Sequence, residues 1–271
     1  MSSIFATGVS GTIGKHFKNQ VTPINYDLRN SELRNIPHIK IGDCILHAAA
    51  VVGPKSVSED RIIAHKVNVK ASKMLAQFAK DNGIARFVYV STAHVYARSN
   101  SLLTELSPTS PNNVYAEQKL EAEREISSVF RDCPEKLCIV RVFSVLDWDV
   151  AGFTLGGGIR KLISDNSNFI LKYGDDVRDF LTPQLIANTL ISIANKVHLT
   201  GIVNLSTGMG ITVKDAAKKM LEVSGYKLPV DRIASGNSDY PHVVGDNSKL
   251  KIALPDLSLE WHPSRLLNPN I

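Results

Sequence analysis

Tyr115 and Lys119 are the two residues whose types and spacing have the clearest chemical use, because side chains four apart on a helix lie on one face. A phenol with a pKa of about 10 is a poor base at neutral pH. A neighbouring ammonium favours the phenolate and lowers that pKa. The pair therefore predicts proton transfer by Tyr115. The alternative is an ordinary helix in which the tyrosine packs and the lysine is solvated.

Ser91 and Thr92 place two hydroxyl groups at the end of an apolar run that starts at Phe87. Open parallel sheets bind their ligands at the carboxyl ends of the strands. A hydroxyl there can hydrogen-bond a substrate oxygen that gains or loses a proton. The alternative is a strand-end hydroxyl that only caps the following turn.

Three glycines, Gly8, Gly11 and Gly14, follow the first apolar run in "SSIFATGVSGTIGKHF", residues 2–17. Glycine allows a tight turn, a close approach of backbone N–H groups to a pyrophosphate, and close packing of the next helix on a sheet. The spacing indicates a dinucleotide-binding loop, although a plain strand-to-helix turn can also use glycines.

The elements that position these residues alternate along the chain, which predicts an α/β fold: a Rossmann-type doubly wound parallel sheet with a small C-terminal lobe. We expect residues 1–147 to form the dinucleotide-binding domain and residues 148–271 the substrate-binding lobe, of which a segment at about 178–206 packs back on the first domain. Expected strands are 4–7, 21–26, 44–49, 87–91, 137–143 and 202–205. Expected helices are 64–82, 115–129, 183–195 and 213–224.

The "TGxxGxxG" form that starts at Thr7 resembles the extended branch of the short-chain dehydrogenase/reductase superfamily, the NAD-dependent epimerase/dehydratase family of nucleotide-sugar type. Further segments resemble the same family in the same order over most of the chain. They are "CILHAAAVVG" (44–53), "VNVKASKMLAQFAKDNGIARFVYVST" (67–92), "TELSPTSPNNVYAEQK" (104–119), "VRDFLTPQLIANTL" (177–190) and "GIVNLSTGMGITVKDAAKKM" (201–220).

The resemblance implies a role for each matching position. Its catalytic set is Thr92, Tyr115 and Lys119, with Lys119 also holding ribose hydroxyls. Its cofactor-binding set adds Gly8, Gly11, Thr12, Ile13, Gly14, Ala48, Ala49, Ala50, Asn68, Ser91 and Phe143. Its substrate-binding set is Thr92, His94, Ser144 and Arg178. The implied chemistry is hydride transfer between a nicotinamide and a carbinol or keto carbon, without a metal.

Asp27 and Leu28 bear on the choice of cofactor. A carboxylate at the end of the second strand bonds the ribose hydroxyls and repels a 2′-phosphate, which favours NAD. Only a short stretch separates Asp27 from Asp43, so one strand and helix of the family are missing or compressed, and Asp27-Leu28 could instead match a later pair that contacts adenine. Arg29 could tolerate NADP, which stays open.

The family resemblance leaves the reaction open between a 4-epimerase and a 4-ketoreductase. Dehydratases of the family resemble "STDEVYG", whereas this chain reads "STAHVYA", so a 4,6-dehydratase is not expected. Arg178 stands where relatives hold a diphosphate, a task that suits a guanidinium; the alternative is an ion pair with Asp175, Asp176 or Asp179. Ser144 replaces a usual asparagine, which affects the choice of sugar.

Two further functions stay open at this stage. One is a reductase of a small non-nucleotide carbonyl compound, and the other is a non-catalytic NAD(P)-sensing regulator. A regulator has no need of Thr92, Tyr115 and Lys119 together, so these residues favour an enzyme, with polysaccharide synthesis as an expected setting.

Composition fits a folded enzyme. The 271 residues are 44% hydrophobic and carry a formal net charge of +5, with the cations spread along the chain, so nucleic acid is not an expected partner. No apolar stretch approaches the roughly 20 residues of a membrane span and no signal pattern opens the chain, which favours the cytoplasm. Cys44, Cys133 and Cys138 show no metal spacing. We expect a homodimer that pairs through the tyrosine-bearing helix and its neighbour, with a pocket that is open or completed by the partner.

Overall fold

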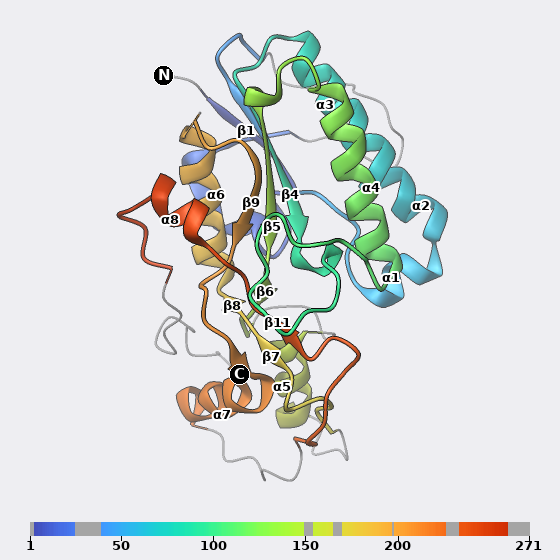
Figure 1. The fold of residues 1–271 in the computed structure, drawn as a ribbon, viewed down its shortest axis with the longest axis vertical. Coiled ribbons are helices and arrows are strands. Elements are labelled where there is room, and N and C mark those ends of the chain that lie inside the picture. Colours follow the sequence, from blue (N-terminus) through green and yellow to red (C-terminus); the bar gives the residue numbers. More distant parts are fainter. Residues whose placement is uncertain are drawn as a thin grey trace.

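A computed structural model describes residues 3–24, 39–148, 154–164, 170–196, 198–225 and 233–259. Its centre is a six-stranded parallel sheet with the strand order β2-β1-β3-β4-β5-β9 (Figure 1). The strands are β1 (Ile4–Thr7), β2 (Thr22–Pro23), β3 (Cys44–His47), β4 (Arg86–Thr92), β5 (Leu137–Val142) and β9 (Gly201–Leu205). The predicted α/β fold with a Rossmann-type sheet is confirmed.

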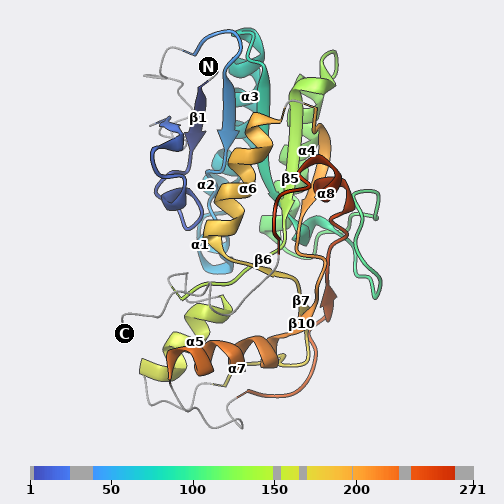
Figure 2. The same cartoon turned by 90° about the vertical axis from the view of Figure 1, so that its left-hand side faces the viewer.

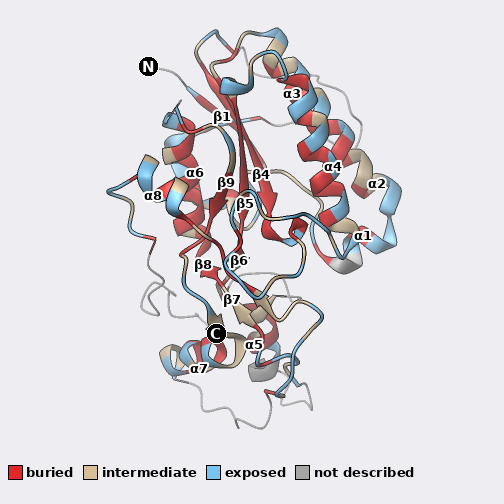
Figure 3. Ribbon diagram, in the orientation of Figure 1, coloured by how far each residue is buried: buried red, intermediate tan, exposed pale blue. Residues whose placement is uncertain are grey.

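Helices cover both faces of this sheet because its central strands are apolar on both sides. One face carries α1 (Pro54–Glu59), α2 (Arg61–His65), α3 (Ser72–Asp81) and α4 (Val114–Val129), and the other carries α6 (Pro183–Asn195) and α8 (Ser248–Ala253) (Figure 1). Alternate residues divide between the two layers: Phe87 and Tyr89 pack with α3 and α4, whereas Val88 and Val90 pack with α6. The strands and the helix faces beside them are therefore buried (Figure 3).

The expected helix over 64–82 is more complex than its periodicity predicts. α2 and α3 are joined by a π-helical segment, Lys66–Ala71, which places Asn68 inside it. Such π-bulges are frequent at functional sites. Here the widened turn accompanies a buried, hydrogen-bonded Asn68 side chain.

The glycine loop is not followed by the α-helix that a dinucleotide-binding loop ordinarily opens. Two short 3-10 turns, Gly14–His16 and Lys18–Gln20, make the crossover to β2, and Phe17 between them is 1% exposed. The stretch up to Thr22 is too short for a long helix, so a buried phenylalanine anchors the crossover. Of the strand predicted at 21–26, the structure shows Thr22–Pro23, and Asp27 and Leu28 lie outside the described residues.

A smaller lobe lies beyond the carboxyl ends of the main strands (Figure 2). It contains α5 (Leu155–Ser164), α7 (Val213–Ser224), a three-stranded sheet and a two-stranded sheet. The three-stranded sheet has the order β10 (Ile211–Thr212), β7 (Val177–Arg178), β11 (His242–Val243), and the two-stranded sheet pairs β6 (Ser144–Val145) with β8 (Phe180–Leu181). Leu146, Trp148, Phe180 and Met220 share its core. Between these elements the chain passes back to the main sheet, which α6 covers and to which β9 adds the last strand.

Candidate active site

Thr92 ends β4, at the edge of the sheet that faces the smaller lobe. It is 7% exposed, and its Oγ1 accepts a hydrogen bond from the His94 backbone N–H at 3.3 Å, which caps the 3-10 turn Ala93–Val95. Thr92 therefore caps the turn that follows it, as the alternative interpretation of this hydroxyl expects. The Thr92 hydroxyl keeps its proton, so it can still donate to a substrate oxygen.

Tyr115 and Lys119 lie in the first two turns of α4. The helix starts there because the Asn113 side chain accepts the Ala116 N–H at 2.9 Å, an N-cap. Lys119 is 2% exposed, and its Nζ lies 4.0 Å from the centre of the Tyr89 ring on β4. The ammonium is thus held against the sheet by a cation–π contact.

The expected lowering of the Tyr115 pKa is absent in this structure. Burial raises the pKa of Tyr115 to about 12. Burial also lowers the pKa of Lys119 to about 7, against the opposing effect of the Glu123 carboxylate. Desolvation is the first cause of both shifts, although Tyr115 is half-buried whereas Lys119 is 2% exposed. Tyr115 is therefore a proton donor at neutral pH.

Ser91, Glu123 and Arg141 form a buried polar cluster next to this pair. Ser91 Oγ donates to Glu123 Oε1 at 2.5 Å. Arg141 donates to the same carboxylate twice, from Nη2 at 2.7 Å and from Nε at 3.1 Å. Glu123 and Arg141 are not among the residues predicted from the sequence. The available signal was the spacing of Glu123, which follows Lys119 by one helical turn.

The glycine loop packs on the alanine segment that follows β3. Gly8 has a φ of +74°, and a Cβ there would lie 2.7 Å from the Ala49 nitrogen. A Cβ on Gly14 would lie 2.0 Å from the Gly8 carbonyl oxygen. The Gly11 N–H donates to the same oxygen at 3.0 Å, so side chains are excluded where the loop closes on itself. Thr12 and Ile13 complete the loop, and Ile13 packs on the main core.

His47 links the glycine-loop strand to the helical layer. Thr7 Oγ1 lies 2.6 Å from His47 Nδ1, and His47 Nε2 lies 2.8 Å from Ser72 Oγ. Because the Ser72 hydroxyl donates to the Asn68 carbonyl at 2.9 Å, it accepts from Nε2, and Nδ1 accepts from Thr7. Burial, with a smaller effect of Lys119, lowers the pKa of His47 to about 3, so the ring is neutral.

Asn68 fixes the segment after the alanines. Its side-chain oxygen accepts the Val51 N–H at 2.8 Å, and its nitrogen donates to the Val51 carbonyl at 3.0 Å and to Gln118 Oε1 at 2.9 Å. It therefore connects Val51, the residue that follows the Ala48–Ala50 segment, with α4.

Arg178 lies on β7 in the smaller lobe. Its Nη2 lies 2.7 Å from Asp176 Oδ2, which realises the ion-pair alternative, and its Nη1 donates to the Val177 carbonyl at 2.9 Å. Desolvation lowers the pKa of His94, and the Arg178 charge lowers it further. His94 itself is exposed to solvent, in the turn that follows Thr92.

Phe143, Ser144 and Asp179 form the connection between the lobes. Phe143 is 4% exposed and belongs to the main core, with its ring 6.4 Å from that of Tyr96. Ser144 is half-buried, and its N–H donates to the Asp179 carbonyl at 2.9 Å. The Asp179 carboxylate accepts from the N–H groups of Thr207, at 2.8 Å, and Gly208, at 2.9 Å, so it holds a turn and does not pair with Arg178.

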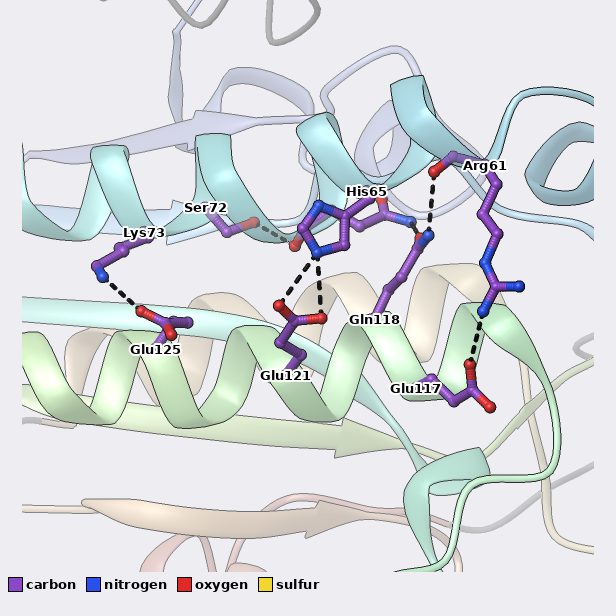
Figure 4. A network of polar contacts seen from close by, with 9 residues as sticks. Arg61, His65, Ser72, Lys73, Glu117, Gln118, Glu121 and Glu125 are labelled. Carbon is purple, nitrogen blue, oxygen red and sulfur yellow. Dashed lines mark hydrogen bonds and ion pairs between the residues drawn. The ribbon is translucent and has the colours of Figure 1, made fainter.

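The outer face of α4 makes two exposed ion pairs and one histidine–carboxylate hydrogen bond to the neighbouring helical segments (Figure 4). Arg61 pairs with Glu117 at 3.3 Å, His65 with Glu121 at 3.1 Å, and Lys73 with Glu125 at 2.5 Å. The same helix thus presents a solvated charged face and a buried face that bears Lys119 and Glu123.

Metal-binding and membrane-spanning features are absent from the described ranges. No group of three histidine, cysteine or acidic side chains there could hold a metal ion. No helix among those residues is long and apolar enough to cross a membrane. Cys44, Cys133 and Cys138 are free thiols.

The names of several curated relatives of this sequence describe enzymes that act on nucleotide sugars. UDP-glucose 4-epimerase 2 of Oryza sativa subsp. japonica is 24% identical over 69% of this chain and 52% of its own length. UDP-arabinose 4-epimerase 1 of Arabidopsis thaliana is 24% identical over 77% and 56% of the two chains. The chain spans about half the length of these first relatives. GDP-6-deoxy-D-talose 4-dehydrogenase of Aggregatibacter actinomycetemcomitans is 24% identical over 77% and 71%.

Solved structures share the fold. RMD from Pseudomonas aeruginosa, complexed with NADPH, superposes with a TM-score of 0.84 at 19% identity, over 98% of this chain and 96% of that one. UDP-glucose 4-epimerase of Thermus thermophilus, complexed with NAD, gives 0.75 at 19% identity, over 97% and 94%. The sequence model of the NAD-dependent epimerase/dehydratase family matches residues 14–205. This chain therefore belongs to the NAD-dependent epimerase/dehydratase family, and its cofactor is a nicotinamide dinucleotide.

Proposed function

We propose that this protein is an NAD(P)-dependent enzyme that transfers hydride at a carbinol or keto carbon of a nucleotide-linked sugar, as a 4-epimerase or a 4-ketoreductase. One observation carries the proposal. Tyr115 and the buried Lys119 share the face of α4 that covers β4, the strand that ends at Thr92, in a chain of this family. A proton donor, a cation and an orienting hydroxyl are thus available at the sheet edge where ligands bind.

The residues present fit a dinucleotide. The Gly8–Gly14 loop closes so tightly that a Cβ on Gly8 or Gly14 would strike backbone, as expected of a loop whose N–H groups approach a diphosphate closely. Gly11, Thr12 and Ile13 would hold the diphosphate, and Lys119 would hold ribose hydroxyls. When bound, the nicotinamide supplies or accepts the hydride. We favour NAD, and NADP stays open because Asp27 and Arg29 lie outside the described residues.

Proton transfer falls to Tyr115. With its pKa raised to about 12 by burial, its hydroxyl is protonated and can donate to the oxygen of a keto group as hydride arrives. In the opposite direction Tyr115 has to take up that proton, which a charged Lys119 next to it favours. Thr92 would hold the same oxygen by a second hydrogen bond.

We assign substrate recognition to residues of both lobes. Arg178 would hold the diphosphate, and its pairing with Asp176 orients the guanidinium without using all of its donors. His94 and Ser144 would contact the sugar. Ala93 and His94 stand where dehydratases resemble each other in having an acid pair, so we propose no dehydration.

Two other functions are weaker candidates. Reduction of a small non-nucleotide carbonyl compound would leave Arg178 without a phosphate to bind. A cofactor-sensing regulator would have no use for Thr92, Tyr115 and Lys119 together. We further propose a cytoplasmic homodimer that pairs through α4 and its neighbouring helix. A monomer mass in light scattering at micromolar concentration would contradict that assembly.

The function is tested by the Tyr115→Phe variant, with Tyr173→Phe as a matched control because Tyr173 is 48% exposed in the smaller lobe. The assay follows turnover of UDP-, GDP- and dTDP-linked sugars and their 4-keto forms with NAD(H) and NADP(H). We expect the control to match the wild type. Tyr115→Phe should lose roughly 10²-fold to 10⁴-fold in kcat and retain cofactor affinity. Equal turnover in both variants would refute the proposed role of Tyr115.

A further inference from the structure

Glu123 and Arg141, which form a buried cluster with Ser91, have no part in the chemistry proposed above. Ser91 and Arg141 are register partners on β4 and β5, so their side chains meet on the same face of the sheet, under α4. Glu123 accepts from both, and each of the three residues is at most 4% exposed. A buried ion pair is weak evidence for stability, because well-packed apolar residues often replace it without loss. The cluster therefore points to a role of Glu123 beyond stability.

Glu123 lies one helical turn after Lys119 on the same face of α4. The Lys119 Nζ rests on the Tyr89 ring at 4.0 Å, in a site that is closed to water on most sides. Burial lowers the pKa of Lys119 to about 7, and the Glu123 charge is the effect that opposes burial. Burial and the Glu123 carboxylate thus act in opposite directions on the charge of Lys119.

We infer that Glu123 is a positioning residue that holds Lys119 as an ammonium ion, with Arg141 and Ser91 fixing the place of the Glu123 carboxylate. The inference rests on the proposed function, in which a charged Lys119 binds ribose hydroxyls and supports proton uptake by Tyr115. It explains why an arginine and a serine from two strands converge on one carboxylate that no substrate reaches.

The titratable side chains around Lys119 and Glu123 have pKa values that burial moves away from neutral pH. His47 on β3 has a pKa lowered to about 3, and Tyr115 on α4 has one raised to about 12. Tyr89 on β4 has its pKa raised well above its ordinary value by burial, and burial likewise raises the pKa of Tyr96, which the Arg141 guanidinium covers at 4.6 Å. Among these neighbours of Lys119 and Glu123, none has a pKa near 7.

The test is the affinity for NADH, measured by fluorescence titration between pH 5.5 and pH 8.5 without any sugar. Glu123→Gln removes the charge and keeps the shape. Glu125→Gln is the matched control, because Glu125 pairs with the exposed Lys73 on the outer face of the same helix. If the pKa of Lys119 falls by about one unit, Glu123→Gln binds NADH about tenfold more weakly than the wild type at pH 8. The difference should narrow as the pH falls toward 5.5.

A curve for Glu123→Gln that superimposes on the wild-type curve would overturn the inference. The assay uses no sugar, so it separates the two claims. A wild type that is inert on every nucleotide sugar but shows the expected NADH curves would refute the proposed function and leave the role of Glu123 standing.

A second variant guards against misfolding, because Glu123→Gln leaves Arg141 without a charged partner. The double variant Glu123→Leu/Arg141→Met replaces both members of the pair with apolar side chains, which folded proteins often tolerate. Its fold is checked by circular dichroism and thermal melting. A folded double variant should show the same loss of NADH affinity at pH 8, whereas wild-type affinity across the range would refute the role of Glu123.

Discussion

The two faces of α4 carry similar residues in different surroundings. The outer face holds Glu117, Glu121 and Glu125, which form polar contacts with the segments beside it (Figure 4). The inner face holds Lys119 and Glu123, which are buried against β4 and β5. In a single protomer solvent screens the outer contacts, so each contributes little. On the inner face desolvation shifts the pKa of Lys119, and the charge of Glu123 opposes that shift. Chemistry is therefore expected on the face where charges are costly to place.

The largest expected difference between the faces is in activity. Lys119→Met removes the buried ammonium and should lower kcat/KM roughly 10²-fold to 10⁴-fold, as expected for the loss of proton-transfer support and ribose binding. Lys73→Met removes an exposed lysine that pairs with Glu125 and should leave kcat/KM unchanged. Steady-state kinetics on the best nucleotide sugar compares the two. Similar losses in both would break the contrast.

The next difference is in stability. Glu123→Ala leaves Arg141 buried without its partner and should lower the free energy of unfolding by about 3–5 kcal/mol. Glu125→Ala should cost under about 1 kcal/mol, because its side chain and that of Lys73 are exposed. Urea unfolding at pH 7.5 measures both. A loss of about 1 kcal/mol or less for Glu123→Ala would show that the buried pair relaxes after truncation.

A pH-dependent effect of intermediate size is expected from His47. Its pKa is about 3 in the folded protein, below the value of about 6.5 in an unfolded chain, so the unfolded state binds a proton first as the pH falls. The stability due to neutral His47 is complete above pH 6.5 and falls by about 1.4 kcal/mol per pH unit toward pH 3. His47→Asn should remove this slope, and His65→Asn on the outer side should keep it. The slopes come from urea unfolding at pH 7.5, 6 and 5.

The smallest effect is expected from salt. Glu117→Gln breaks the exposed pair with Arg61, and its cost should be under about 1 kcal/mol at low salt and should vanish in 1 M NaCl. Unfolding at the two salt concentrations measures this. A cost that persists at high salt would mean that the outer face is less solvated than its exposure indicates.

Local patterns predicted much of this fold. The predicted and observed bounds agree for Ile4–Thr7, Pro183–Asn195 and Val213–Ser224, because each carries its own apolar periodicity and its own turn or cap residues. No α-helix follows Gly14, because the crossover is short and the single buried side chain of Phe17 anchors it in place of an apolar helix face. The π-helical segment around Asn68 has no sequence period of its own and could not be predicted.

The candidate site divides in the same way. Tyr115 and Lys119 are visible in the sequence because one helix sets their spacing. Glu123 and Arg141 were missed because their contact depends on the register of β4 with β5, and the raised pKa of Tyr115 depends on how α4 covers the sheet. The predicted placements of Asp27 and Leu28 remain predictions, since both lie outside the described residues.

The central claim is that the inner face of α4 and the glycine loop form a dinucleotide-dependent hydride-transfer site. The most direct measurement is mass spectrometry of the nucleotide released when freshly purified protein is denatured, followed by NADH and NADPH titration of any empty fraction. Stoichiometric NAD would support an epimerase, which regains its hydride from the same cofactor molecule. An empty protein that binds NADH or NADPH would support a reductase. Protein that releases no dinucleotide and binds neither would contradict the account.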